Sequence, residues 1–194
     1  YHREISRELA RHMKKLLPEK GELKALVVGL GNREITPDSL GPDVISNLHI
    51  TRHLIQEYGT LGMGETCVHS VSGLVPGVMA QTGMETMEII RGVVEETKPD
   101  VVIAIDALAA RSVKRLNRTI QLTDTGIQPG SGVGNHRNGL SETTLGVKVI
   151  GIGVPTVVDA ATIVQDAMSH LLDALEEQEK KELLLTLKGK ESIT

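Results

Sequence analysis

The sequence contains very few aromatic residues, and this shortage excludes one class of binding site. There is no Phe and no Trp, and the only aromatic residues besides histidine are Tyr1 and Tyr58. The chain therefore lacks the stacking platforms on which single-stranded nucleic acids are held. A net charge of −4 and a pI near 6.0 also argue against a surface that follows phosphates. We expect no direct nucleic-acid partner.

Cysteine and long apolar runs are scarce as well. Cys67 is the only cysteine, which excludes an internal disulfide and a cysteine-rich zinc site and fits a reducing compartment. Its place in a predicted strand favours a small buried side chain over a nucleophile. No run of about 18 apolar residues suggests a membrane span, and the first residues, YHREISRELARHMKK, lack the apolar core of a signal peptide. These features predict a cytoplasmic protein with no membrane partner.

The hydrophobic pattern alternates between short apolar runs and helical spacing. A length of 194 residues suits a single domain, residues 1–194. Strands alternating with helices predict a three-layer α/β/α sandwich with a mostly parallel sheet. The predicted strands are residues 24–29, 66–71, 100–105, 118–123 and 147–154, and the predicted helices are residues 7–17, 42–55, 85–98 and 159–187.

Asp106 is the most informative residue of the chain. It follows five apolar residues, 101–105, in the segment KPDVVIAIDALAAR. Such a run is typical of a strand that is buried on both faces of a parallel sheet. We expect the strand to end at Asp106, at the edge of the sheet where open α/β folds bind their ligands.

We expect another strand to place Asp38 at the same edge of the sheet. Residues 25–28 lead into GLGNREITPDSLGP, which contains Asp38. Each aspartate alone could simply cap a turn or a helix. Two carboxylates held close together cannot both ionise easily, so one of them keeps a proton. Such a pair could activate water against a peptide carbonyl and protonate the leaving group.

Other candidate sites have simpler interpretations. The pair Gly29 and Gly31 invites a dinucleotide-binding hypothesis, but Glu34 stands where that fingerprint needs a third glycine, so we favour a tight turn. His49 and His53 share a face of one predicted helix without completing H-E-x-x-H, which favours two surface histidines. A loop at 126–139, rich in Gly, Asn and Ser, exceeds the usual connection length, and such loops are often functional.

Four segments resemble the spore germination protease family of endospore-forming bacteria. They are GLGNREITPDSLGP, SGLVPGVMAQTGMET, IAIDALAARSVKRLNRTIQLTDTGIQPGSGVGN and IGVPTVVDAATI, and the resemblance spans about residues 25–166. It implies a fold similar to hydrogenase-maturation proteases (phosphorylase/hydrolase-like). It also implies an endopeptidase that degrades small acid-soluble spore proteins during germination, located in the spore core. An autoprocessed zymogen and a homotetramer are further implications.

The resemblance implies site residues too. The family's proposed catalytic aspartates fall at Asp38 and Asp106, without a metal or cofactor. Cleavage after an acidic side chain calls for a cationic partner, for which Arg111, His136 and Arg137 are candidates by charge. Arg111 could instead pair with Asp106 or form a structural salt bridge. The family is longer than 194 residues, so we expect sequence to be missing at both ends.

Three alternatives remain open on sequence grounds. The first is a metal-dependent maturation peptidase of the hydrogenase type, with Asp38, Asp106 and His136 as ligands. The second is a peptidyl-tRNA hydrolase, suggested by VGLGN and the pair Arg52-His53, although that pair lies too far from Asn32 and the pI is acidic. The third is a non-catalytic binding domain, for which replacing either aspartate would leave function intact.

Overall fold

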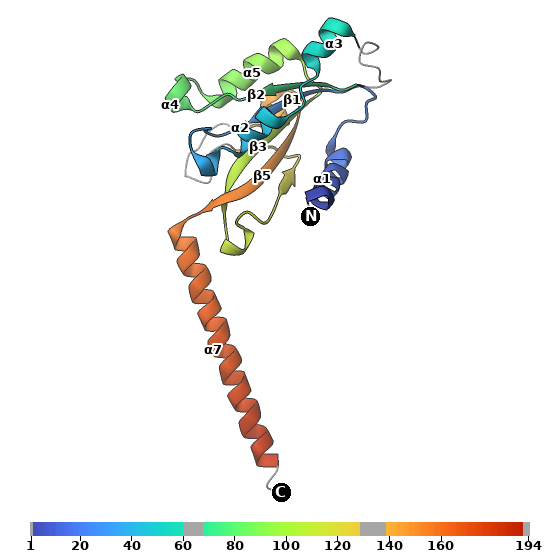
Figure 1. The fold of residues 1–194 in the computed structure, drawn as a ribbon. Coiled ribbons are helices and arrows are strands. Elements are labelled where there is room, and N and C mark those ends of the chain that lie inside the picture. Colours follow the sequence, from blue (N-terminus) through green and yellow to red (C-terminus); the bar gives the residue numbers. More distant parts are fainter. Residues whose placement is uncertain (1, 60–67, 129–138, 192–194) are drawn as a thin grey trace.

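The computed structural model describes residues 2–59, 68–128 and 139–191, with side chains described as far as Lys181. Its centre is a five-stranded sheet with the order β2-β1-β3-β5-β4 (Figure 1). Only the pairing of β4 with β5 is antiparallel, so the predicted mostly parallel sheet is confirmed. The strands are β1 (Lys24–Gly29), β2 (Ser70–Leu74), β3 (Val101–Ala110), β4 (Gln121–Thr123) and β5 (Lys148–Val158).

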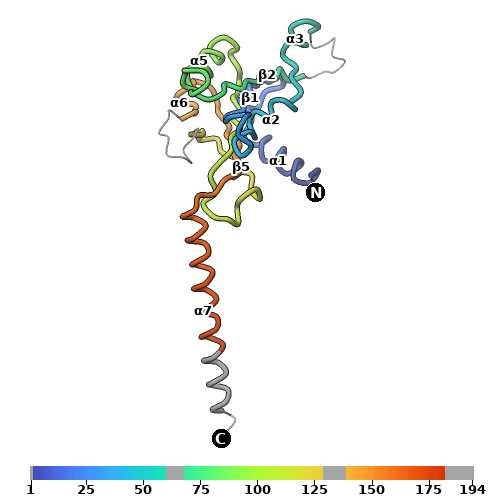
Figure 2. The backbone as a smooth tube through the Cα atoms, turned by 60° about the vertical axis from the view of Figure 1, so that its left-hand side comes forward, coloured from blue at the N-terminus to red at the C-terminus, as the bar shows by residue number. Residues whose placement is uncertain are grey.

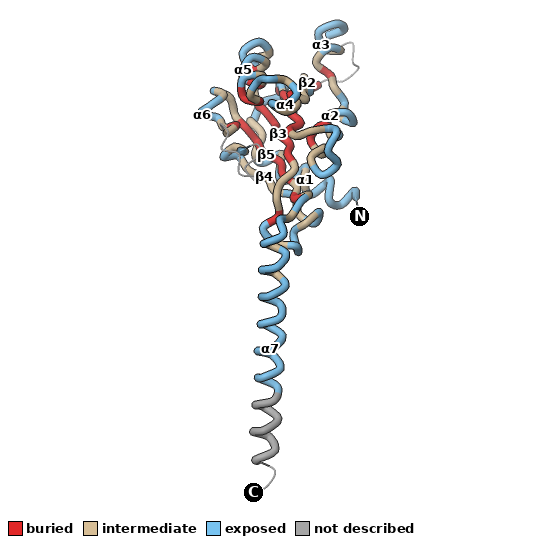
Figure 3. Tube along the Cα trace, turned by 90° about the vertical axis from the view of Figure 1, so that its left-hand side faces the viewer, coloured by how far each residue is buried: buried red, intermediate tan, exposed pale blue. Residues whose placement is uncertain are grey.

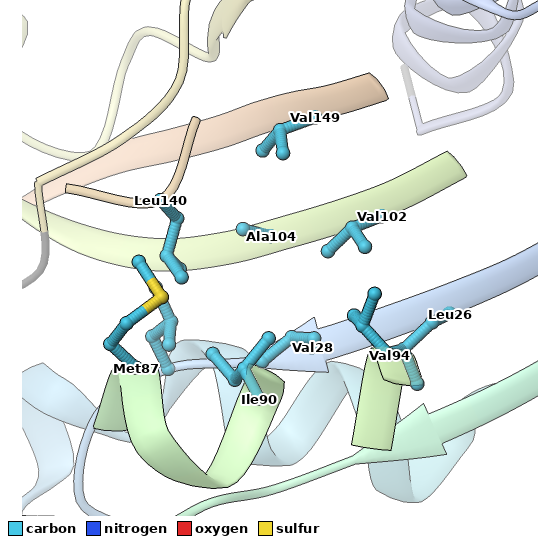
Figure 4. Packing of buried hydrophobic residues seen from close by; sticks show 10 residues of the cluster. Leu26, Val28, Met87, Ile90, Val94, Val102, Ala104, Leu140 and Val149 are labelled. Atoms are coloured by element: carbon cyan, nitrogen blue, oxygen red, sulfur yellow. The ribbon is translucent and has the colours of Figure 1, made fainter. Parts of the chain in front are cut away.

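One face of the sheet is covered by α5 (Thr86–Thr97). Glu85 and Glu88 begin this helix with a reciprocal capping box, which satisfies amides of the first turn. The helix turns Met87, Ile90 and Val94 toward the sheet (Figure 4). They pack on apolar side chains of β1, β3 and β5, namely Leu26, Val28, Val102, Ala104 and Val149, and on Leu140, which precedes β5 in the chain.

The opposite face is covered by α1 (His2–Leu16) and α2 (Leu40–Asn47), as Figure 2 shows. The sheet contributes branched aliphatic residues to this second core, among them Val27, Ile103, Ile105, Ile150 and Ile152. Met13 and Leu16 of α1 and Val44 and Ile45 of α2 pack against them. The predicted three-layer α/β/α sandwich is therefore confirmed, and the hydrophobic core residues that the structure describes include no aromatic side chain.

The single helix predicted from residue 42 to residue 55 is wrong, because the chain forms two helices, α2 and α3 (Arg52–Tyr58). Thr51, which is buried between them, donates its hydroxyl to the carbonyl of His69 at 2.5 Å and accepts from the amide of Val71 at 2.9 Å. These bonds tie the break to β2. His49 precedes α3 and His53 lies on it, both exposed, so the premise of a shared helix face fails.

The last helix, α7 (Ala160–Glu191), runs away from the sheet (Figure 1). Asp159 caps it by accepting a hydrogen bond from the amide of Thr162 at 2.9 Å, as its predicted start requires. Near this end, Asp166 accepts from the amide of Val113 at 2.7 Å, which joins α7 to η3 (Val113–Arg115). Figure 3 shows that α7 is exposed over most of its described length.

The remaining described helices are short: η1 (Thr36–Asp38), α4 (Met79–Thr82) and α6 (Glu142–Leu145). β2 occupies residues 70–74 rather than the predicted 66–71. None of the helices in the described ranges is long and apolar enough to cross a membrane.

Candidate active site

Asp106 lies at the point where β1 ends and its neighbour β3 continues. The last residue pair between these strands is Gly29 with Ile105, and the amide of Leu30 still donates to the carbonyl of Ile105 at 2.8 Å. β3 then runs on to Ala110, with Asp106 opposite Gly153 of β5. The predicted end of the strand at Asp106 is therefore wrong. Asp106 nevertheless lies beside the carboxyl end of β1, because that strand ends at Gly29, opposite Ile105.

Asp38 is the last residue of η1, in the turn that connects β1 to α2. The amide of Asn32 donates to the carbonyl of Asp38 at 3.1 Å and to its carboxylate at 2.8 Å. The amide of Asp38 in turn donates to the carbonyl of Ile35 at 2.8 Å. The turn is thus closed on itself and holds the Asp38 carboxylate by a main-chain donor.

Two glycines allow this turn to pack against the strands. Gly31 has a φ of +108°, and a Cβ added there would clash with the carbonyl of Asp38 and lie 2.9 Å from its carboxylate oxygen. A Cβ on Gly41 would clash with the main chain of Leu30 and lie 2.7 Å from the carbonyl of Ile105. The glycine-rich segment after β1 therefore serves close packing around the aspartates, in line with the tight turn predicted for it.

The environment of Asp106 favours its protonated form. The residue is only 5% exposed. Burial, and to a smaller extent the negative charge of Asp38, raise the pKa of Asp106 to about 7, although the amide of Ala107 opposes both effects. Near neutral pH, a substantial fraction of the Asp106 carboxyl groups therefore keep their proton.

Asp38 is less buried and has a main-chain donor. Its partial burial raises the pKa of Asp38 above the usual range, and the hydrogen bond from Asn32 opposes this rise. Since solvent contact and an amide donor both favour a carboxylate, we infer that Asp38 ionises before Asp106. The two carboxyl groups are thus placed in environments that separate their protonation states, as acid–base catalysis by a pair requires.

Arg111 lies just beyond β3 and is exposed. Five residues of extended chain place it about 16 Å along from Asp106, at roughly 3.3 Å per residue. In the part of the chain that the structure describes, Arg111 forms no ion pair, so the alternative pairing with Asp106 is not formed. His136 and Arg137 lie outside the described residues, as does Cys67, and their roles stay predictions.

One contact to the aspartate turn, which is residues 30–39 between β1 and α2, was not predicted from the sequence. The hydroxyl of Thr156 donates to the carbonyl of Pro37 at 2.6 Å and links β5 to η1. Pro155 was the sequence feature that could have indicated an irregular strand here, since proline inside a sheet is confined to edges and bulges.

No group of three or more His, Cys, Asp or Glu side chains suited to a metal occurs among the described residues. The hypothetical ligand set of Asp38, Asp106 and His136 includes a residue outside them.

Comparisons with known proteins point to one family. A family model described as germination protease matches residues 1–188. A germination protease of Caldanaerobacter subterraneus subsp. tengcongensis is 52% identical over 178 residues, covering 92% of this chain and 54% of that protein. One from Clostridium tetani is 53% identical over 175 residues, covering 90% and 54%. The chain thus spans about half the length of these curated relatives.

Among solved structures, the chain is similar to the NiFe hydrogenase maturation protease HycI from Thermococcus kodakarensis KOD1. The TM-score is 0.41 and the sequence identity 17%, and the match covers 79% of this chain and 92% of that chain.

Proposed function

This chain belongs to the germination protease family, and we propose that it acts as an endopeptidase through Asp38 and Asp106. The observation that supports this most strongly is the contrast between the two carboxyl groups. One is buried with its pKa raised to about 7, and the other, on a turn from a neighbouring strand, keeps solvent contact. A general base and a general acid are thereby available together near neutral pH.

In the proposed reaction, the Asp38 carboxylate removes a proton from a water molecule. The oxygen of that water adds to the carbon of the scissile peptide bond. Protonated Asp106 then gives its proton to the amide nitrogen, and the bond between carbon and nitrogen breaks to leave a carboxylic acid and an amine. Asp38 and Asp106 exchange protonation states in each turnover, and solvent restores them.

For the substrate, we propose the small acid-soluble spore proteins, cleaved after an acidic side chain. Arg111 supports this part because it is an exposed cation beyond the end of the strand that holds Asp106. His136 and Arg137 are further candidates by charge. The resemblance noted in the sequence supports the remaining parts of the proposal: an autoprocessed zymogen, a homotetramer and a location in the spore core.

The metal-dependent maturation peptidase is not favoured as an alternative, since the matched family and the curated relatives reported above are germination proteases. The two hypotheses also differ in a simple experiment. A hydrolytic metal would have to be removable by a chelator, whereas an aspartate pair works without one.

The test is cleavage of a purified small acid-soluble spore protein, with and without EDTA, followed by mass spectrometry of the products. We expect cleavage after Glu or Asp that EDTA does not change. Asp38→Asn and Asp106→Asn should each abolish it, while Asp173→Asn, at an exposed position of α7, should not. Full cleavage by either site variant, or loss of cleavage with EDTA and recovery with metal, would contradict the proposal.

A further inference from the structure

The pairing of β3 with β5 contains one irregularity, and it falls beside the aspartate turn. The two strands pair residue by residue from Val101 with Lys148 to Leu108 with Pro155. The next pair is Ala109 with Val157, so Thr156 has no partner on β3. This is the arrangement of a β-bulge, in which one extra residue on one strand redirects a side chain.

The redirected side chain reaches a segment that is distant in sequence. The hydroxyl of Thr156 donates to the carbonyl of Pro37 at 2.6 Å. Pro37 directly precedes Asp38 in η1. The hydrogen bonds from the amides of Asn32 and Asp38 are local and fix the internal shape of the turn, and the bond from the amide of Leu30 to the carbonyl of Ile105 joins only its start to β3. The bond from Thr156 fixes the turn relative to the sheet that contains Asp106.

We propose that Thr156 is a positioning residue, whose hydroxyl sets the place of Asp38 relative to Asp106. The bulge supplies the hydroxyl at this point, because the extra residue interrupts the regular alternation of side chains along β5. The catalytic consequence rests on the function proposed above. The positioning itself does not, because it can be measured in the resting protein.

The chemistry of the contact defines two informative substitutions. Thr156→Ser keeps a hydroxyl donor, whereas Thr156→Val keeps the shape and removes the donor. A matched control is Thr97→Val, because the hydroxyl of Thr97 also donates to a carbonyl, that of Val93, at 2.7 Å. Thr97 is the last residue of α5 and precedes β3, at the opposite end of that strand from Ala110.

The first readout is the titration of the Asp106 carboxyl carbon, followed by NMR. The charge of Asp38 contributes to the raised pKa of Asp106, and charge interactions weaken with distance. When the turn loses its tether to β5, we expect Asp38 to move outward and the Asp106 titration to shift to lower pH in Thr156→Val. Thr156→Ser and Thr97→Val should titrate as the wild type does.

The second readout is kcat/KM in the cleavage assay. Loss of one hydrogen bond of ordinary strength corresponds to a fall of about five- to tenfold. We expect this fall in Thr156→Val, recovery in Thr156→Ser and no change in Thr97→Val. Thermal unfolding of each variant separates this effect from loss of the fold.

The outcomes separate the two proposals. A shifted Asp106 titration in Thr156→Val that Thr156→Ser restores supports positioning, even if the wild-type chain cleaves nothing, in which case only the proposed function fails. An unchanged Asp106 titration in folded Thr156→Val would overturn the positioning role. So would an equal loss of kcat/KM in the Val and Ser variants with unchanged titration, because it would indicate a structural effect alone.

Discussion

Asp106 is buried opposite Gly153 with almost no solvent contact, whereas Asp38 receives a main-chain amide from Asn32 and stays half-exposed. Under the function proposed above, this difference distinguishes the two roles that the sequence left open. In the proposed reaction the buried carboxyl, which keeps its proton, is the acid, and the more exposed one, which gives it up, is the base.

The rate of cleavage should depend on pH through both aspartates. The proposed reaction requires Asp38 ionised and Asp106 protonated, so kcat/KM should fall as pH rises through about 7, the pKa to which burial and the charge of Asp38 raise Asp106. It should also fall on the acidic side, where Asp38 becomes protonated, at a pH above the usual range for aspartate. The measurement is kcat/KM in overlapping buffers from about pH 4 to about pH 9. A flat profile between neutral and alkaline pH would remove Asp106 as the acid.

Asp106→Asn should change how stability depends on pH. The folded pKa of about 7 lies above the unfolded value, so the native state holds this proton more tightly than the unfolded state does. The stability that this proton provides is present at acidic pH and is lost as pH rises from about 4 to about 7. The variant has no carboxyl group at this position, so its stability does not fall in this way. As pH rises across that window, its free energy of unfolding should therefore increase relative to that of the wild type by on the order of a few kcal/mol.

Urea unfolding followed by circular dichroism measures this difference, since the chain has no tryptophan to report by fluorescence. Asp173→Asn is the matched control, because Asp173 is exposed on α7. A constant difference between Asp106→Asn and the wild type from pH 4 to pH 8 would show that Asp106 is not held protonated in the folded chain.

Gly31→Ala should disrupt the aspartate turn. The φ of +108° is unfavourable for any residue with a side chain, and the new Cβ would clash with the carbonyl of Asp38. We expect a loss of about 2–3 kcal/mol in the free energy of unfolding and loss of cleavage. Gly92→Ala, on α5 with nothing within 4 Å of an added Cβ, should instead stabilise by about 0.5–1 kcal/mol. Thermal unfolding of the two variants tests both expectations, and equal melting temperatures would refute this account of Gly31.

Arg111→Glu should alter the choice of substrate rather than the fold, because Arg111 is exposed and forms no ion pair in the described part of the chain. We expect kcat/KM to fall by about tenfold or more for a peptide with Glu before the cleaved bond. For the matching Gln peptide the change should be small. If the ratio of the two rates stays the same, the cation that selects acidic residues is not Arg111, and His136 and Arg137 become the candidates.

Much of the sheet and both aspartates could be predicted from local patterns. The apolar runs in β1, β3 and β5 are near-continuous because these strands are buried on both faces, and such runs can be recognised from the sequence alone. Asp38 and Asp106 became candidates because each follows a run of this kind. Their common edge followed from the parallel direction of β1 and β3.

The features that could not be predicted depend on contacts between distant segments. The break between α2 and α3 is fixed by Thr51, whose hydroxyl bonds to the main chain of His69 and Val71, at the start of β2. The length of β3 beyond Asp106 depends on β5, which continues beside it after β1 has ended. The contact from Thr156 to Pro37 joins residues 119 positions apart, and no hydrophobic periodicity in the sequence indicates it.

The exposure of α7 has a consequence for hydrogen exchange. At about 1.5 Å per residue, its 32 residues extend about 48 Å. Asp166 joins the first turns to η3, but from Ala167 to Lys181 every residue is exposed. The amide hydrogens of that stretch can exchange with solvent deuterium through local opening of the helix. Those of β1 and β3 exchange only when a larger part of the sheet unfolds. A single exchange experiment on the intact chain would thus show α7 and the sheet as two separate kinetic classes.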